Sequence, residues 1–208
     1  MTDQQPFQSE TKRLEQLWSG EFGDKYIDRN AKAGDVRGPF WQELLARLRP
    51  ARVLEVGCNV GGNLRWVAET VPRKDVFGID VNQKAIEQLC VTLPGINAVW
   101  GAARELPFRD RWFDLVFTMG VLIHQPETTL SLVMAEIVRC SRRYILCGEY
   151  FAEQTEEVAY RGHEGALFRR NYGKLYQEIF PDLSLHSKGF LSRAQGWDDV
   201  TYWVFEKA

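Results

Sequence analysis

The sequence predicts an α/β fold with a doubly wound, mostly parallel sheet in three layers, and three observations support this prediction. Short β-rich runs alternate with helical patterns between residues 51 and 150. The run FDLVFTMG (113–120) is almost entirely apolar, as expected for a strand that is buried on both faces. A glycine-rich stretch, EVGCNVGGN (55–63), separates the first strand from the helix that follows it. Repeated β-α units of this kind build a parallel sheet covered by helices.

The individual elements follow from local patterns. We expect strands at 51–57, 75–80, 96–100, 113–120 and 143–150. Apolar residues recur every three or four positions between them, which predicts helices at 63–71, 85–93 and 130–140. Pro72 and Pro94 end the first two of these helices. Two runs near the end of the chain, 183–191 and 200–207, predict a closing pair of strands at one edge of the sheet.

The length of 208 residues suits a single domain. Two regions lie outside the β-α repeat, and we expect both to cover the carboxyl ends of the strands, where ligands bind in open α/β sheets. In one of them, a helix over 20–30 would place Phe22, Tyr26 and Asn30 on one face. The expected parts are an N-terminal helical cover (1–38), a cofactor-binding core (39–150), a substrate cover (151–182) and the closing strand pair (183–208).

Composition, charge and residue spacing give no support for several classes of partner. A formal net charge of −2 provides no attraction to nucleic acids or anionic membranes, so we expect neither as a partner. The spacing of the four cysteines and three histidines matches no zinc signature, and we expect no metal. The N-terminal residues lack the apolar segment of a signal peptide. We therefore expect a cytoplasmic monomer or homodimer that acts on a small molecule.

The glycine-rich loop and the acid after the second strand indicate a nucleoside site. Asp80 closes the second strand at about the spacing at which an acid accepts hydrogen bonds from ribose hydroxyls. A dinucleotide would bring its pyrophosphate near Glu55, at a cost of ~1 to 4 kcal/mol. S-adenosylmethionine has no phosphate and carries an ammonium and a sulfonium, so it suits that acid. Asn59, which replaces a glycine, tolerates the left-handed backbone that the turn needs.

Three alternatives remain open at this point. Gly57, Asn59 and Gly62 miss the dinucleotide fingerprint only at the middle position, so an NAD-dependent oxidoreductase is the competing enzyme. A binding module could keep the cofactor pocket and transfer nothing. The loop could also be a plain strand-to-helix turn, with Asp80 as a helix cap.

Taken together, the motif E-x-G-x-x-x-G, the acid after strand two and the run FDLVFTMGVLIH resemble class I S-adenosylmethionine-dependent methyltransferases over about residues 40–150. The resemblance implies a Rossmann-like sheet of seven strands with an antiparallel last strand. It also implies S-adenosylmethionine as the methyl donor and S-adenosylhomocysteine as the product. The implied cofactor-binding residues are Glu55, Gly57, Cys58, Asn59, Gly61, Asp80, Val81, Ala102, Ala103, Arg104, Thr118, Met119 and Gly120.

The flanking segments carry a second, more particular resemblance. The stretches GEFGDKYIDRN (20–30), EY (149–150) and YRGHEGALFRRNYG (160–173) resemble methyltransferases associated with pseudaminic acid biosynthesis. This resemblance covers nearly the whole chain. It implies methylation at oxygen or nitrogen of a small polar metabolite, such as an amino sugar, an amino-acid-like compound or another natural-product intermediate.

The candidate catalytic and substrate-binding groups lie in the same segments. His124 follows the fourth strand and is the first candidate for the base that removes a proton from the acceptor; it could equally shape the pocket. Tyr26, Glu149 and Tyr150 are the alternative acid-base or orienting groups. Arg29 or Arg37 could pair with the carboxylate of the cofactor. The candidate substrate-binding residues are Tyr26, Arg29, Asn30, Glu149, Tyr160, Arg161 and His163. Their competing roles are packing in an amphipathic helix and polar contacts within a loop.

Overall fold

A computed structural model describes the backbone of residues 5–30 and 36–208, and the side chains of residues 10–27 and 36–208. Seven strands form one sheet: β1 (Val53–Val56), β2 (Val76–Asp80), β3 (Asn97–Trp100), β4 (Phe113–Met119), β5 (Ser141–Glu149), β8 (Leu183–Leu191) and β9 (Val200–Lys207). The short strands β6 (Glu156–Glu157) and β7 (Phe168–Arg169) pair separately. The α-helices are α1 (Gln5–Ser19), α2 (Glu21–Asn30), α3 (Gly38–Leu48), α4 (Leu64–Thr70), α5 (Gln83–Thr92), α6 (Glu127–Cys140) and α7 (Tyr172–Ile179). The single-turn 3₁₀ helices are η1 (Arg73–Asp75), η2 (Leu122–His124) and η3 (Arg193–Gln195).

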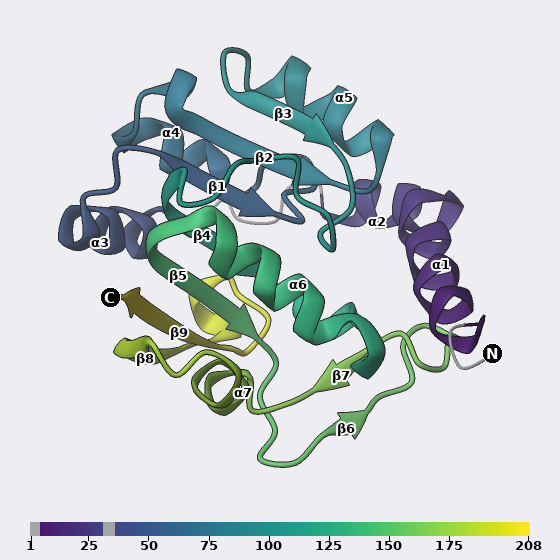
Figure 1. Ribbon diagram of the computed structural model, residues 1–208. Helices are drawn as coiled ribbons and strands as arrows, with labels where there is room; N and C mark the ends of the chain where they lie inside the picture. The colour runs from purple at the N-terminus through teal and green to yellow at the C-terminus, as the bar shows by residue number, and fades with distance from the viewer. Residues whose placement is uncertain (1–4, 31–35) are drawn as a thin grey trace.

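The large sheet has the strand order β3-β2-β1-β4-β5-β9-β8 (Figure 1). Strands β1 to β5 run parallel, and β9 is antiparallel to both of its neighbours. This confirms the predicted seven-stranded sheet with an antiparallel last strand. All four residues of β1 are buried, as are the first six of β4, which agrees with the largely apolar sequence of these two strands.

Helices cover both faces of the sheet and complete three layers (Figure 1). On one face, buried residues of α6 and α7 pack against β1, β4 and β5. On the other face, α3, α4 and α5 contribute a second buried cluster that contains the fully enclosed indole of Trp41. Its ring centroid lies 4.7 Å from that of Phe117 in the central strand β4. The core therefore sits on both sides of β1 and β4, whose carboxyl ends carry the site.

The observed boundaries differ from the expected ones where polar groups intervene. Strand β1 begins at Val53 rather than residue 51, because the backbone N–H groups of Ala51 and Arg52 both donate to Asp114 Oδ2 at 2.9 Å. Helix α6 begins at Glu127 rather than residue 130, directly after Pro126. Proline has no N–H, so it costs a helix nothing when it stands just before the first turn.

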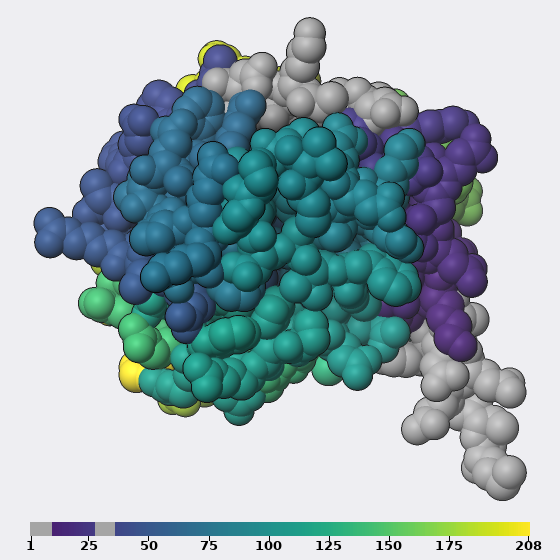
Figure 2. Space-filling view, turned by 90° about the horizontal axis from the view of Figure 1, so that it is seen from above, coloured from purple at the N-terminus to yellow at the C-terminus, as the bar shows by residue number. Residues whose placement is uncertain are grey.

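Two covers lie over the carboxyl ends of the strands. Helices α1 and α2 form one, and the segment 150–170 lies beside it (Figure 1). Arg13 Nη2 donates to the carbonyl oxygens of Glu164 at 3.2 Å and Gly165 at 3.3 Å, which joins the covers. Figure 2 shows the purple surface of the first cover meeting the teal surface around residues 80–110. The rest of the predicted substrate cover forms α7, which packs against β5 and β8 instead.

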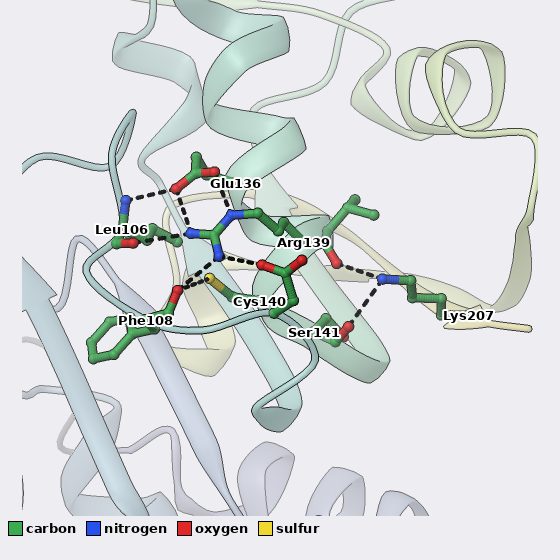
Figure 3. A network of polar contacts seen from close by, with 9 residues as sticks. Leu106, Phe108, Glu136, Arg139, Cys140, Ser141 and Lys207 are labelled. Carbon is green, nitrogen blue, oxygen red and sulfur yellow. Dashed lines mark hydrogen bonds and ion pairs between the residues drawn. The ribbon is translucent and has the colours of Figure 1, made fainter.

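One arginine holds the loop between β3 and β4 against α6 (Figure 3). Arg139 donates to the carbonyl oxygens of Phe108 at 2.7 Å and Leu106 at 3.0 Å. The same guanidinium forms an ion pair with Glu136, whose carboxylate also accepts the N–H of Leu106 at 2.8 Å. This network orders the far end of a loop whose other end, at residues 101–104, reaches the site.

Candidate functional site

A cavity of about 220 Å³ lies at the carboxyl ends of β1, β2 and β4, beneath α1 and α2. It contains the predicted cofactor residues with two exceptions, Gly61 and Thr118, which do not line it. His124, Tyr26, Tyr150 and Tyr160 line the same cavity. The structure therefore brings together residues that are up to 134 positions apart in the chain, from Tyr26 to Tyr160.

The glycine-rich loop takes the left-handed turns expected of it. Gly57, Asn59 and Gly61 have φ angles of +74°, +47° and +81°. A Cβ atom on Gly57 would stand 2.4 Å from Cγ2 of Val121, so any larger residue would push the loop away from the segment after β4. Gly61 supports the turn from below and does not face the cavity.

Asp80 connects this loop to the end of β2. Its Oδ2 accepts the N–H of Asn59 at 2.8 Å, and its Oδ1 accepts the N–H of Asn82 at 2.9 Å. Burial raises the pKa of Asp80, and these backbone hydrogen bonds oppose that effect. Each carboxylate oxygen has a further lone pair, so Asp80 can hold the loop and still accept a hydroxyl from a ligand in the cavity.

Glu55 stands at the other end of the loop in a chain of polar contacts. Its Oε1 accepts a hydrogen bond from Asn63 Nδ2 at 2.7 Å, whereas its Oε2 is buried and has no partner among the described residues. Asn63 Oδ1 in turn accepts from Arg37 Nη1 at 3.2 Å. Burial raises the pKa of Glu55 to about 8, because the carboxylate is removed from water and only one oxygen is satisfied.

Arg37 is held from two further directions. Its Nε donates to the carbonyl oxygen of Gly196 at 3.2 Å, and its guanidinium carbon lies 4.2 Å from the ring centroid of Trp197. Burial lowers the pKa of this guanidinium. Both Arg37 and Trp197 line the cavity, so a segment just before β9 contributes to the site.

The opposite end of the cavity is bounded by the loop after β3. Ala102, Ala103 and Arg104 line it. Arg104 Nε donates to Glu15 Oε1 of helix α1 at 2.6 Å, so this guanidinium fastens the first cover to the core. Beside it, Trp100 Nε1 donates to the carbonyl oxygen of Val81 at 2.9 Å and fixes the backbone after Asp80.

His124 lies at the end of η2 and is buried. Its Nδ1 lies 2.6 Å from the carbonyl oxygen of Ala166. Because a carbonyl only accepts, Nδ1 must carry the hydrogen, and the lone pair of the neutral ring is on Nε2. Burial lowers the pKa of His124 to about 4. The ring is therefore a neutral hydrogen-bond acceptor at physiological pH, and its Nε2 has no partner within the part of the chain that the structure describes.

An aromatic wall surrounds His124; we use this name for Trp18, Phe22, Tyr26 and Tyr160. The ring centroid of Trp18 lies 4.3 Å from that of His124 and 5.3 Å from those of both Phe22 and Tyr26. Tyr160 stands 5.3 Å from His124 and 6.3 Å from Trp18. Two segments far apart in the sequence, 18–26 and Tyr160, thus build one aromatic surface around His124.

The tyrosines of the cavity remain protonated at neutral pH. Burial raises the pKa of Tyr26 well above its usual range and that of Tyr150 to about 12. Neither phenol is available as a base near neutral pH, although both can donate a hydrogen bond. His124 is therefore the better placed of the three predicted catalytic residues to receive a proton.

Glu149 and Thr118 lie behind the cavity rather than in it. The carboxylate of Glu149 is fully buried and accepts the N–H groups of Val121 at 3.3 Å and Ile123 at 3.2 Å. Burial raises the pKa of Glu149 to about 7. These contacts hold the segment that carries His124, so the structure places Glu149 as a support for that segment and not against a substrate.

Two further predicted substrate residues, Arg161 and His163, do not line the cavity. Arg161 is exposed at φ +52°, in the turn between the paired residues Tyr160 and His163. The ring of His163 packs against Phe22 at 4.9 Å, behind the aromatic wall. The side chains of Arg29 and Asn30 lie outside the described residues.

Sequence reasoning missed Trp18, Asn63, Trp197 and Asp198, all of which line the cavity. The sequence did contain a pattern that could have identified Trp18. It stands four positions before Phe22, which itself stands four positions before Tyr26, so a helical spacing relates all three aromatic residues. No comparable signal marks Asp198, which reaches the site only because β9 lies next to β5. Within residues 5–30 and 36–208, no group of three metal-ligating side chains is present, and no helix is long and apolar enough to span a membrane.

Comparisons with known proteins agree with this architecture. Residues 53–143 match the family model described as a methyltransferase domain. Phthiotriol/phenolphthiotriol dimycocerosates methyltransferase 1 of Mycobacterium ulcerans is 37% identical over 94 residues, which is 44% of this chain and 34% of that protein. The fatty-acid O-methyltransferase of Mycolicibacterium smegmatis is 38% identical over 94 residues, or 44% of this chain and 33% of that protein. The chain thus spans about a third of the length of these relatives.

A solved structure extends the likeness to the whole chain. It is the 1,6-didemethyltoxoflavin-N1-methyltransferase of Burkholderia thailandensis, with bound 1,6-didemethyltoxoflavin and S-adenosylhomocysteine. The TM-score is 0.73 at 16% identity, and the match covers 100% of this chain and 92% of the other. At that identity, the likeness concerns the fold. The chain therefore has the Rossmann-like fold of class I methyltransferases, and its segment from β1 into β5 matches the methyltransferase domain in sequence as well.

Proposed function

We propose that this protein is an S-adenosylmethionine-dependent methyltransferase that methylates oxygen or nitrogen of a small polar metabolite. The proposal rests on Oε2 of the buried Glu55 beside the loop, which has no hydrogen-bond partner in the described part of the chain. A buried carboxylate oxygen without a partner is costly, so the cavity calls for a ligand with a cationic donor. S-adenosylmethionine carries an ammonium, and it has no phosphate to oppose the carboxylate.

The other groups at the loop suit the same ligand. Asp80 has lone pairs left for ribose hydroxyls, and the Ala102–Ala103 backbone leaves room for a flat base. Arg37 faces the Glu55 end of the cavity and is placed to pair with a carboxylate. When bound, the cofactor supplies an electrophilic methyl group on a sulfonium. NAD is the weaker candidate, because its pyrophosphate would lie near the buried acid Glu55.

This chain's own part in the reaction is alignment and proton removal. The covers α1–α2 and 150–170 exclude water from the cavity and hold the acceptor, which is how enzymes assist an in-line displacement. His124 is neutral, its Nδ1–H is fixed by Ala166, and its Nε2 lone pair can take the proton that a hydroxyl or N–H group loses. Its lowered pKa makes it a weak base, so this proton moves only as the new bond to the methyl group makes the acceptor acidic. That proton then leaves from the imidazolium to solvent.

Isothermal titration calorimetry tests the cofactor assignment. We expect S-adenosylhomocysteine to bind the wild-type protein, and both Glu55→Gln and Asp80→Asn to weaken binding by at least about tenfold, since each variant removes a charge-assisted hydrogen bond. NAD, titrated in parallel, should give no heat of binding. Binding of NAD in place of S-adenosylhomocysteine would reverse the choice of cofactor.

A second experiment separates an enzyme from a binding module. Methyl-labelled S-adenosylmethionine is incubated with the protein and pooled small-molecule extracts, and labelled products are separated by chromatography. An enzyme should produce label that depends on His124, and His124→Gln should remove most of it. Cofactor binding with no labelled product in any pool would favour the module.

A further inference from the structure

Asn82 belongs both to the cofactor end of the cavity and to the first cover. It is 4% exposed, and it lines the cavity two positions after Asp80. Its backbone N–H donates to Asp80 Oδ1 at 2.9 Å. Its side-chain Oδ1 accepts the N–H of Ala85 at 3.0 Å and so caps helix α5. The oxygen of this side-chain amide therefore has the ordinary role of a helix cap.

The nitrogen of the same amide binds the junction between α1 and α2. Asn82 Nδ2 donates to the carbonyl oxygen of Trp18 at 3.0 Å and to Asp24 Oδ1 at 3.0 Å. Both partners belong to the first cover, 64 and 58 positions earlier in the chain. Serine or aspartate caps a helix as well as asparagine does, and neither offers this donor. The cap thus explains the oxygen of Asn82, and the cover explains its nitrogen.

A glycine inside α2 makes room for this contact. A Cβ atom on Gly23 would stand 1.8 Å from the carbonyl oxygen of Trp18 and 2.9 Å from Asn82 Nδ2. Glycine is unfavourable within a helix, because it loses more backbone freedom on folding than any other residue. Here it stands where the Trp18 carbonyl and the Asn82 amide approach the backbone of α2. The hydrogen bond between them therefore depends on glycine at position 23.

Trp18 extends these contacts to the acceptor end of the cavity, where His124 and the aromatic wall lie. Its carbonyl oxygen accepts from Asn82, while its ring centroid lies 4.3 Å from that of His124. Contacts thus run from Asp80 through Asn82 and Trp18 to the imidazole. A ligand that donates to Asp80 fixes the carboxylate and the turn that directs the Asn82 side chain. Order gained at one site in this way lowers the entropy cost of binding at the next.

From this arrangement we infer that Asn82 is a positioning residue that couples the cofactor end of the site to the acceptor end. A nucleoside bound at Asp80 orders the turn at residues 80–82. The Nδ2 group of Asn82 then holds Trp18, and with it the aromatic wall, against His124. The acceptor therefore meets a better ordered pocket once the cofactor is in place. The inference rests on the proposed function, because the ligand that it places at Asp80 is S-adenosylmethionine.

Hydrogen exchange of the whole chain, with and without saturating S-adenosylhomocysteine, tests the coupling. The measured quantity is the factor by which the ligand slows amide exchange in peptides from residues 10–27. Asn82→Ser keeps an oxygen that caps α5 and removes both donated hydrogen bonds, so this factor should fall about fivefold. A contact that only fastened the cover would change exchange equally with and without ligand and leave the factor unaltered. An unaltered factor in Asn82→Ser overturns the inference.

Asn97→Ser is the matched control. Its side-chain amide also donates two hydrogen bonds, to the carbonyl oxygens of Lys74 at 2.8 Å and Val76 at 3.2 Å. Asn97 stands at the start of β3 and does not line the cavity. This variant should keep the wild-type factor. A loss as large as that in Asn82→Ser would show a general effect of the substitution and would contradict the coupling.

Gly23→Ala tests the same contact from the side of the cover. It leaves Asn82 and its helix cap in place, but its Cβ atom displaces the Trp18 carbonyl, so the factor should fall as in Asn82→Ser. A wild-type factor in Gly23→Ala contradicts the inference. If Asn82→Ser does not fold, Gly23→Ala decides by the same measurement.

Peptides from the loop at residues 57–63 separate the two proposals in the same samples. If the ligand slows exchange in this loop, and the factor for residues 10–27 does not depend on Asn82, the inference fails and the proposed function stands. If the ligand slows exchange nowhere in the wild type, both fail together.

Discussion

Two titratable side chains at the cavity have pKa values that burial moves in opposite directions, and each provides a test of the site. Glu55 has one unpaired oxygen and an elevated pKa of about 8. His124 donates through Nδ1 and has a depressed pKa of about 4. In both cases burial disfavours the charged form. The site therefore keeps both groups largely neutral near pH 7, until a ligand supplies a partner.

Binding of the cofactor should release a proton from Glu55. At pH 7 a carboxyl with a pKa of about 8 is mostly protonated, and a bound ammonium favours the carboxylate, so roughly one proton should leave for each S-adenosylhomocysteine bound. Calorimetric titrations in buffers with different ionisation enthalpies measure this number. Glu55→Gln has no such proton to release. A wild-type protein that releases none would contradict the assignment of Glu55.

The depressed pKa of His124 should make stability depend on pH. The unfolded chain binds a proton at His124 below about pH 6.5, while the folded chain does so only below about 4, so stability falls as pH decreases through this window. The loss should be roughly 3 kcal/mol at its greatest. Urea unfolding of the wild type and of His124→Gln at pH 7 and pH 4.5 measures it. The variant should lose less stability than the wild type; an equal loss would show that His124 is not responsible.

At the scale of elements, the covers are positioned by a few buried or shared polar contacts. Arg170, which begins the segment leading to α7, is 1% exposed. It donates to the carbonyl oxygen of Gln125 at 3.0 Å, one residue after His124, and to Tyr172 Oη at 3.4 Å. This arginine therefore connects the second cover to the corner that carries His124. The first cover is connected to the core through the pair of Glu15 and Arg104.

Arg170→Met should destabilise the protein by about 2 to 3 kcal/mol, because it removes charge-assisted hydrogen bonds and leaves the Gln125 carbonyl without this donor. Arg169→Met is the matched control. Its side chain is exposed and lies 3.9 Å from Glu156, so the change should stay within about 0.5 kcal/mol. Chemical unfolding of both variants gives the comparison. Similar losses in the two would argue that burial of Arg170 matters little.

Breaking the pair between the first cover and the core should speed cofactor release. Glu15→Gln removes a partly exposed ion pair worth ~0.2 to 1 kcal/mol, so the dissociation rate of S-adenosylhomocysteine should rise about 1.4- to 5-fold. Stopped-flow fluorescence measures this rate. Glu21→Gln removes the pair with Lys25 on the exposed side of α2 and serves as the control. If both variants release the ligand at the wild-type rate, α1 does not limit its exit.

At the scale of the whole molecule, the site lies between a rigid sheet and two covers. The middle of the sheet, around β1 and β4, is buried on both faces. Helices α1 and α2 contribute little to either core cluster: the described side chains of residues 10–27 belong to neither. Regions with few buried apolar contacts open more readily than the core.

Hydrogen exchange should therefore change unevenly when the cofactor binds. We expect S-adenosylhomocysteine to slow amide exchange in peptides from α1 and α2, and to leave β4 and β5 unchanged, because those strands are already protected. Exchange followed by mass spectrometry, with and without ligand, makes the comparison. Equal protection of sheet and covers, or none in the covers, would contradict the assigned role of α1 and α2.

The sequence predicted most of the sheet because its signals are local. Continuous apolar runs mark β1 and β4, prolines end the helices, and Asp80 and Asn59 mark the loop. It did not predict helix α7. This helix is amphipathic over only two turns, and the buried rings of Tyr172 and Tyr176 hold it in place. It also placed Arg161 and Glu149 against a substrate. A polar residue in a sequence does not show whether its side chain faces a cavity, a neighbouring backbone or solvent.

The sequence by itself determined the order of the β-α units, the left-handed loop, the acid before it and the acid that closes β2, because a local pattern marks each of them. Only the tertiary structure decided which residues surround His124. Trp18, Tyr160 and Ala166 reach it from separate segments, and Asp198 arrives with β9. These contacts depend on the order of the strands in the sheet and on how the covers pack. The periodicity of residues within a single segment does not predict them. The acceptor end of the site is therefore a property of the folded molecule.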